Sequence, residues 1–233
     1  MSATRTVGFQ TSRRTFVAAG TAALAAVVTH PAIGHVIAPA PISGFELPQP
    51  MALKPFRLID HRAKPFGPDR LKARWTLLLF GFTHCPDVCP TTLSQVAQVR
   101  SHVRRIDASI PTASVFVTID PARDSPARLT DYVAQFGDDL VGLTGAKDEI
   151  EAFARQFRIR YAPTKHTGAS GYLFDHTASV SALGPDGRLH AIFTLPLRAE
   201  KVAADIARMQ HHAVLTPILT GSADTPACNL EKA

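Results

Sequence analysis

The chain carries, at residues 75–90, the run WTLLLFGFTHCPDVCP. Its first six residues are mostly apolar, as in a buried strand, and the Gly and Cys-Pro steps that follow are typical of a turn into a helix. This order of patterns places Cys85 near a helix N-terminus. Unpaired N–H groups and the positive end of the helix dipole favour a thiolate there, and a thiolate is both a nucleophile and a soft metal ligand.

Three residues separate Cys85 from Cys89, one more than in the Cys-x-x-Cys motif of thioredoxin-like enzymes. On a helix this spacing places the two sulfurs one turn apart on the same face, able to chelate one ion or to be oxidised together. Two cysteines that merely pack in the core are the plainer alternative, but the turn-forming residues Pro86, Asp87 and Pro90 argue against it. Metal binding and redox chemistry both remain open.

The composition, 45% hydrophobic and 19% charged over 233 residues, indicates one globular domain. The first 40 residues contain no acidic residue, and Arg13 and Arg14 stand directly before an apolar block at residues 16–28. This pattern predicts a twin-arginine-like export signal, too short to span a bilayer comfortably. We expect residues 1–40 to direct export to the bacterial periplasm, with the protein then soluble or tethered by an uncleaved N-terminal segment.

Export would change both the net charge of the mature protein and the redox conditions around its cysteines. Removing the three arginines in residues 1–40 takes the formal net charge from +6 to +3. Without a Lys/Arg cluster that carries interleaved aromatic residues, the sequence gives no indication of nucleic-acid binding. In an oxidising compartment neighbouring cysteines tend to join, so a protein that needs free thiols there must be kept reduced or metal-loaded.

The chain divides into a proline-containing linker at 41–54, a domain at 55–212 and a flexible tail at 213–233. Within the domain, periodicity predicts strands at 56–60, 75–82, 113–119, 140–143, 172–175, 178–183 and 189–193, and helices at 92–106, from Ser125-Pro126 onward, at 147–157 and at 198–211.

This order of elements predicts an α/β protein with a thioredoxin-like fold, in which helices flank a central mixed sheet. Pro185-Asp186-Gly187 supplies the turn of a late β-hairpin. The chemistry is expected at the carboxyl ends of the strands, where Cys85 already lies.

Two thiolates select soft metals such as Cu(I) or zinc, but two ligands seldom complete a specific site. Most of the ten histidines are scattered singly, whereas His176 follows a predicted strand in the late sheet. His84 adjoins Cys85 and is expected to make local hydrogen bonds, and His166 lies in a Thr/Lys/Gly-rich loop. The residues alone leave His176 as one candidate for a third ligand.

Three motifs in this order resemble those of the SCO/SenC copper proteins: GFTHCPDVCP at 81–90, IDPARDSP at 119–126 and FDHT at 174–177. The resemblance, which covers roughly residues 54–210, implies a thioredoxin-like domain that binds copper through Cys85, Cys89 and His176. Two thiolates and an imidazole suit Cu(I), whereas Cu(II) would take a further nitrogen or oxygen ligand.

Members of this family deliver or prepare copper for the binuclear centre of cytochrome c oxidase, and some are argued to reduce that centre's cysteines. The resemblance therefore implies three partners: the oxidase subunit that carries this centre, a copper donor chaperone and a thiol reductant. It also leaves membrane association open, because many members keep a transmembrane anchor.

Three carboxylates are candidates for contacts just outside the ligand set. Asp87 lies between the sulfurs and could approach the ion or orient a water, although the helix dipole alone accounts for an acid there. Asp120 shares a loop with Arg123 and Asp124, for which turn and cap roles are equally good explanations. Asp175 should point away from its neighbour His176, because consecutive strand side chains face opposite ways.

The leading hypothesis is a copper metallochaperone rather than an enzyme with a small substrate. The alternative is a thiol-disulfide oxidoreductase in which Cys85 attacks, Cys89 resolves and His176 tunes the thiolate. The wider cysteine spacing counts against ordinary thioredoxin chemistry without excluding a specialised reductase. Cys228 lies beyond the matched region, where an incidental tail residue, a free thiol or an intermolecular disulfide are the alternatives.

Overall fold

The computed structural model describes residues 43–137, 139–165 and 172–220. The predicted export signal, His166 and Cys228 lie outside these residues, and so does the last part of the predicted tail. The chain separates into two units, 1–39 and 40–233, and the second contains every described residue.

The described strands and helices follow the predicted order closely. The strands are β1 Phe45–Met51, β2 Leu58–Asp60, β3 Pro65–Phe66, β4 Trp75–Gly81, β5 Thr112–Thr118, β6 Leu140–Thr144, β7 Tyr161–Lys165, β8 Tyr172–His176, β9 Ser179–Leu183 and β10 Leu189–Thr194. The α-helices are α1 Val88–Ile106, α2 Pro126–Val133, α3 Lys147–Gln156 and α4 Ala199–Thr220, with short 3₁₀ turns at Pro68–Leu71 and Ala134–Phe136.

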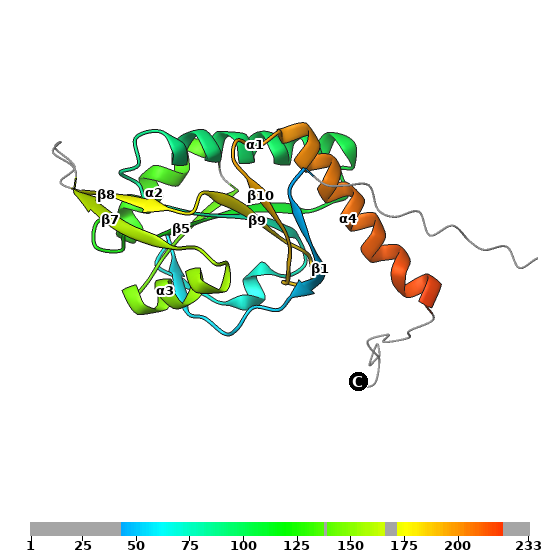
Figure 1. Cartoon of the computed structure of the whole chain (residues 1–233), viewed down its shortest axis with the longest axis horizontal. Helices are drawn as coiled ribbons and strands as arrows, with labels where there is room; N and C mark the ends of the chain where they lie inside the picture. The colour runs from blue at the N-terminus through cyan, green and yellow to red at the C-terminus, as the bar shows by residue number, and fades with distance from the viewer. Residues whose placement is uncertain (1–42, 138, 166–171, 221–233) are drawn as a thin grey trace, which may run out of the picture. The chain divides into compact units, whose positions relative to one another are not determined.

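Eight of these strands form one mixed sheet in the order β1-β10-β9-β4-β5-β6-β2-β3. The central strands β4, β5 and β6 are parallel, while the other pairings in this sheet are antiparallel. Helices α1 and α3 lie on opposite faces (Figure 1). The predicted thioredoxin-like α/β architecture is confirmed, and β9 and β10 form the hairpin expected around Pro185-Asp186-Gly187.

Strand β4 lies at the centre of the core because both of its faces are buried. Leu77 and Leu79 pack into the cluster formed with α1, α2 and α4, whereas Leu78 and Phe80 pack into the cluster formed with α3. The two-residue alternation of a strand thus supplies both cores from one apolar run. A continuous apolar sequence is what a central parallel strand requires.

Helix α1 begins at Val88, four residues before the predicted start at residue 92. Pro90 lies in the first turn of α1, where a proline costs no helical hydrogen bond because the N–H groups there have no partner within the helix. Helix α2 begins after Ser125, as predicted. Ser125 is its N-cap: the hydroxyl accepts a hydrogen bond from the Arg128 N–H at 3.2 Å, and Pro126 occupies the first turn.

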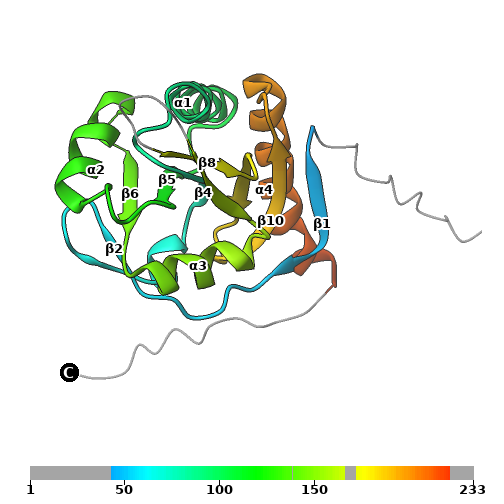
Figure 2. The same cartoon turned by 60° about the vertical axis from the view of Figure 1, so that its left-hand side comes forward.

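The segment predicted as a linker, residues 41–54, contains the edge strand β1. It runs antiparallel alongside β10 (Figure 2), with Phe45 opposite Ile192 in the register. Prolines suit an edge strand because one side of the strand has no neighbour that needs its N–H groups. The Asp205 carboxylate of α4 accepts hydrogen bonds from the Ser43 N–H at 2.8 Å and the Ser43 hydroxyl at 2.7 Å.

Two further differences concern the second half of the chain. Strand β7, which periodicity did not reveal, pairs antiparallel with β8 in a separate two-stranded sheet. Helix α4 continues to Thr220, into the segment predicted as a tail, although the prediction ended it at residue 211. No helix within 43–137, 139–165 and 172–220 combines the length and apolar character needed to cross a membrane.

The Ser43–Asp205 contact should contribute to stability. We expect Asp205→Ala to lower the free energy of unfolding by about 1–2 kcal/mol, since a buried carboxylate that accepts two hydrogen bonds is lost. Urea denaturation followed by circular dichroism measures this. Asp131→Ala, which removes an exposed carboxylate of α2, is the control and should change little; equal stability of all three proteins would show that β1 is not anchored through Asp205.

Candidate functional site

The two central cysteines lie together at the carboxyl end of β4. Cys85 is in the loop that follows this strand, and Cys89 is the second residue of α1. Both are free thiols; Cys89 is buried, with 1% of its surface exposed, whereas Cys85 is half-buried. The Cys89 N–H donates to the Cys85 sulfur at 3.4 Å, so the predicted helix N-terminus does face the first sulfur.

The surroundings of Cys85 favour a thiolate. The hydrogen bond from the Cys89 thiol holds the pKa of Cys85 well below its ordinary value, at about 5. The N–H groups of Cys89 and Asp87 and the nearby charge of His176 act in the same direction, against the opposing effect of burial. The helix N-terminus therefore stabilises the negative sulfur, as expected from its unpaired donors.

The pKa of Cys89 shifts in the opposite direction. Its hydrogen bond to Cys85 raises the pKa of the Cys89 thiol, and burial and the neighbouring Cys85 charge raise it further. The pair thus holds one proton between two sulfurs, with the negative charge on the more exposed Cys85. This asymmetry supplies one reactive sulfur and one protected sulfur.

Gly81 leaves room for the buried sulfur. A Cβ at this last residue of β4 would lie 2.7 Å from the Cys89 Sγ and 2.7 Å from a ring carbon of Phe116. Both distances are shorter than nonbonded contacts allow. A glycine is therefore needed here for close approach, so that α1 can pack its first turn directly against the strand.

Asp124 holds the cysteine loop in place. Its carboxylate is fully buried and accepts hydrogen bonds from the Thr83 N–H at 3.0 Å, the Thr83 hydroxyl at 2.6 Å and the Thr118 hydroxyl at 2.6 Å. These contacts join the carboxyl ends of β4 and β5 two residues before Cys85. His84, next along the loop, contacts the Thr83 hydroxyl at 3.2 Å, which confirms its predicted local role.

Sequence reasoning treated Asp124 as a turn residue and missed this role. The available signal was its position directly after a predicted parallel strand, because the carboxyl ends of neighbouring parallel strands share one edge of the sheet. The pattern could not reveal which of the two loop acids, Asp120 or Asp124, turns inward to the cysteine loop.

His176 is the last residue of β8, on a different part of the chain from the cysteines. Its ring stands edge-on to Phe82, with 6.3 Å between centroids, and its Nδ1 lies 3.1 Å from the Thr177 carbonyl oxygen. His176 is close enough to influence Cys85 electrostatically. Within the described part of the chain, however, no three His, Cys, Asp or Glu side chains are placed so that they could hold a metal ion.

The three candidate outer carboxylates have different surroundings. Asp87 is exposed and precedes α1, where its Oδ1 accepts a hydrogen bond from the Thr91 hydroxyl at 3.3 Å. Asp120 is buried and contacts Arg123 and Tyr172, so it faces β8 rather than the sulfurs. Asp175 is exposed, in agreement with the alternation that turns it away from the half-buried His176.

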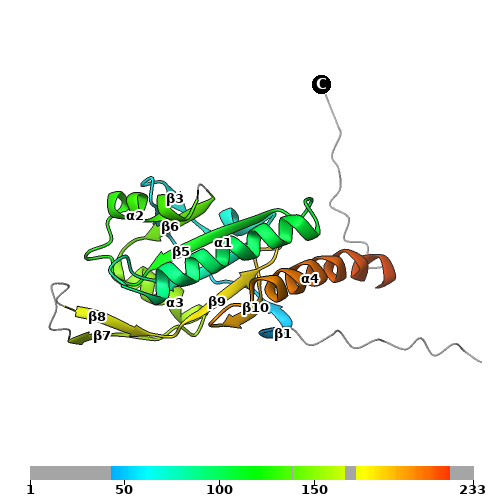
Figure 3. The same ribbon diagram turned by 90° about the horizontal axis from the view of Figure 1, so that it is seen from above.

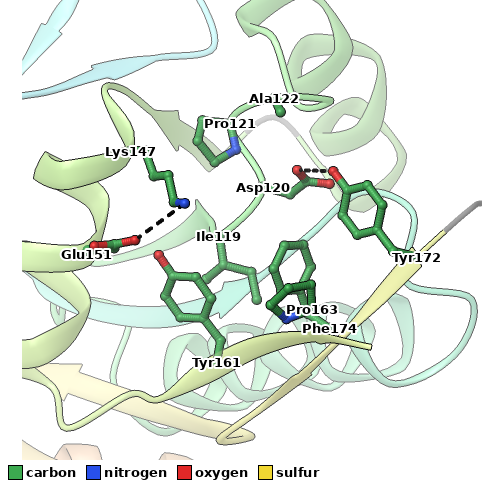
Figure 4. A pocket seen from close by; sticks show the side chains of 10 residues that line it. All are labelled: Ile119, Asp120, Pro121, Ala122, Lys147, Glu151, Tyr161, Pro163, Tyr172 and Phe174. Carbon is green, nitrogen blue, oxygen red and sulfur yellow. Dashed lines mark hydrogen bonds and ion pairs between the residues drawn. The ribbon is translucent and has the colours of Figure 1, made fainter. Parts of the chain in front are cut away.

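A hollow of about 420 Å³ adjoins this end of the sheet, between α3 and strands β7 and β8. Apolar and aromatic side chains form most of its lining, including Ile119, Tyr161 and Phe174, and the ion pair of Lys147 and Glu151 lies at one side (Figure 4). It is separate from the cysteine pair, since neither cysteine lines it.

Fold and site together define a thioredoxin-like protein whose Cys-x-x-x-Cys dithiol lies at the N-terminus of a helix. The sequence pattern of the SCO1/SenC family matches residues 46–211. The chain belongs to this family.

Individual relatives agree with this assignment. The chain is 36% identical over 159 residues to the human protein SCO1 homolog, mitochondrial, covering 68% of this chain and 53% of that protein. The corresponding mouse protein is also 36% identical, over 165 residues, which cover 70% of this chain and 58% of that protein. The chain thus spans little more than half the length of these curated relatives.

Solved structures extend the similarity to three dimensions. Arabidopsis thaliana ScoI with copper bound has a TM-score of 0.64 and 30% identity, covering 68% of this chain and 98% of that chain. Bradyrhizobium japonicum ScoI with copper bound has a TM-score of 0.59 and 34% identity, covering 66% and 97%.

Loss of the Asp124 carboxylate should destabilise the domain. We expect Asp124→Ala to lower the free energy of unfolding by about 3 kcal/mol, because three donors next to the cysteine loop lose a charged acceptor. Thr118→Val removes one of these donors and also the hydroxyl that accepts from the Asp120 N–H, and should cost about 2 kcal/mol. Urea denaturation tests both, and an Asp124→Ala protein as stable as the parent would contradict the assigned role.

The thiolate of Cys85 should be measurable by its reactivity. In the reduced, metal-free protein the rate of Cys85 alkylation by iodoacetamide should rise with pH to half its maximum near pH 5. The midpoint should move up in Cys89→Ala, because the strongest hydrogen-bond donor is gone. Mass spectrometry identifies the modified cysteine, and a parent midpoint near the ordinary thiol value of about 8.5 would disprove the stabilised thiolate.

Proposed function

We propose that this chain is a copper-binding metallochaperone that delivers or prepares copper for the binuclear copper centre of cytochrome c oxidase. The observation that carries this proposal is the sulfur pair at the start of α1, in a domain of the SCO1/SenC family. The copper-bound ScoI structures of two relatives with at least 30% identity support the choice of metal.

The donor set suits copper as cargo. Cys85 offers a thiolate, Cys89 a second sulfur within the same hydrogen-bonded pair, and His176 an imidazole that contacts Phe82, three residues before Cys85. Two thiolates and one imidazole match the preference of Cu(I) for soft ligands and low coordination number. In the described structure these groups do not form a closed three-ligand cage.

A partly exposed cysteine site is compatible with the transfer of copper to a partner protein. Because Cys85 is half-buried, a partner's ligands could approach the ion from outside and replace the chaperone's ligands one at a time. We propose the oxidase subunit with the binuclear centre as acceptor, with a copper donor chaperone acting before this step. Export of the protein through residues 1–40, to a periplasmic location, is part of the same proposal.

A second candidate function is reduction of a partner disulfide, which the different protonation of the two cysteines favours. The Cys85 thiolate would attack one sulfur of the partner, forming a mixed disulfide and releasing the partner's other sulfur as a thiolate. Once Cys85 is part of the mixed disulfide, its charge no longer raises the pKa of Cys89. Cys89 would then pass its proton to the released partner thiolate, attack Cys85 and release the second partner sulfur as a thiolate. Two electrons pass to the partner, the chain is left with a Cys85–Cys89 disulfide, and a cellular thiol reductant must restore it.

Anaerobic Cu(I) titration of the reduced full-length chain, with a competing chromophoric chelator, tests the proposed ligand set. The parent should bind one copper per chain, and Cys85→Ser and Cys89→Ser should lose stoichiometric binding. His176→Ala should lower the affinity by more than about tenfold, since even residues behind the ligands cost about 10–100-fold when removed.

His102→Ala is the matched control, because this histidine lies near the far end of α1 and contacts Arg105. Unchanged affinity in His176→Ala would remove His176 from the ligand set. No specific copper binding by the parent, together with a readily cycled disulfide, would favour the oxidoreductase function instead.

A further inference from the structure

Strand β8 packs against the domain along most of its length. Tyr172, Leu173, Phe174 and His176 are each half-buried, whereas Asp175 is exposed. Leu173 and Phe174 both pack against the core cluster formed with α3. Phe174 contacts Phe82 with 5.4 Å between ring centroids, and His176 lies edge-on to the same Phe82 ring. The position of His176 therefore depends on how β8 packs against the domain.

Backbone hydrogen bonds do not attach β8 to the main sheet. Among the described strands, β8 forms hydrogen bonds only with β7, and this pair is separate from the eight-stranded sheet (Figure 3). An isolated two-stranded hairpin is marginally stable in water. Side-chain contacts must therefore hold the hairpin against the domain.

One group of these side-chain contacts is at Tyr172, the first residue of β8. The Tyr172 hydroxyl donates to the Asp120 Oδ1 at 2.9 Å (Figure 4), and the Arg123 guanidinium carbon lies 3.7 Å from the centroid of the Tyr172 ring. Arg123 also donates from Nη1 to the Tyr172 carbonyl oxygen at 3.2 Å and pairs with the Asp120 carboxylate. We name Asp120, Arg123 and Tyr172 the β8 clamp.

The clamp and the cysteine loop share one anchor. Asp120 and Arg123 hold β8, while Asp124, in the same loop after β5, holds Thr83 of the cysteine loop. Asp120 is itself fixed, because it is buried and its N–H donates to the Thr118 hydroxyl at 2.9 Å. Residues 120–124 thus connect the strand that carries the histidine to the loop that carries the first cysteine.

We propose that the β8 clamp positions His176 toward the cysteine pair, with Tyr172 as a positioning residue that acts through His176. This inference rests on the proposed function, in which His176 supplies the third copper ligand. A ligand held in place before the metal arrives loses less conformational freedom on binding, which raises affinity without any new contact to the ion.

Tyr172→Phe tests the clamp because it removes only the hydroxyl that Asp120 accepts. Tyr161→Phe is the matched control: Tyr161 lies opposite His176 on β7, and its hydroxyl is buried without a hydrogen-bond partner among the described residues. The full-length variants are compared for Cu(I) affinity, for the imidazole-nitrogen signal in the electron paramagnetic resonance spectrum of the Cu(II) form, and for nuclear Overhauser effects between the Phe82 and His176 rings in the metal-free protein.

We expect Tyr172→Phe to lower Cu(I) affinity about tenfold, as for loss of one hydrogen bond to a charged acceptor. The imidazole signal and the Phe82–His176 effects should weaken with it, while Tyr161→Phe matches the parent. In a His176→Ala background, Tyr172→Phe should produce no further loss of affinity, because the clamp then has no ligand to position.

Two results would overturn the clamp: a Tyr172→Phe protein that keeps the affinity, the nitrogen signal and the ring contacts of the parent, or an equal loss of affinity with and without His176. Failure of the proposed function gives a different result. If His176→Ala alone leaves copper affinity unchanged, the ligand assignment is wrong, and the ring contacts in the metal-free protein still decide whether Tyr172 orients His176.

Discussion

The buried carboxylate of Asp124 is the contact on which the site depends. It accepts three hydrogen bonds from Thr83 and Thr118, and so joins the loops that follow the parallel strands β4 and β5. A buried charge is tolerated only when its hydrogen-bonding capacity is met, which makes this junction strongly specified. These hydrogen bonds fix the loop that leads to Cys85 against the end of β5.

The two sulfurs beside this junction differ chemically. The Cys89 thiol and the N–H groups at the start of α1 lower the pKa of Cys85, while Gly81 lets Cys89 bury its sulfur against the strand. Cys85 is thereby the more acidic and more accessible thiol, and Cys89 is the protected one. The same arrangement serves a soft metal ion or a disulfide, which is why copper transfer and thiol exchange are chemically related in such a site.

His176, the proposed third ligand, is positioned by different elements from the cysteines. The cysteines lie on elements of the central sheet and its first long helix, whereas His176 lies on a hairpin that the main sheet does not hydrogen-bond. Side-chain contacts hold this hairpin against the domain, namely the contact of the His176 ring with Phe82 and the contacts of Tyr172 with Asp120 and Arg123. The position of His176, the proposed third ligand, therefore depends on contacts different from those that place the two cysteines.

The sequence alone determined the elements whose signals are local. The apolar run of β4, the periodicity of the helices and the Ser125-Pro126 cap each depend on residues a few positions apart, as does the placement of Cys85 before a helix. Motif resemblance added the family, which the comparisons confirmed, and the ligand assignment of His176, which remains a prediction.

Only the tertiary structure decided the rest. Edge strand β1 pairs with β10 and is anchored by Ser43 to Asp205, 162 residues away, and its prolines concealed it within an apparent linker. Asp124 bonds Thr83 across 41 residues, and Tyr172 bonds Asp120 across 52. No periodicity encodes such partners, because a hydrogen bond between distant residues depends on how the sheet brings its loops to one edge.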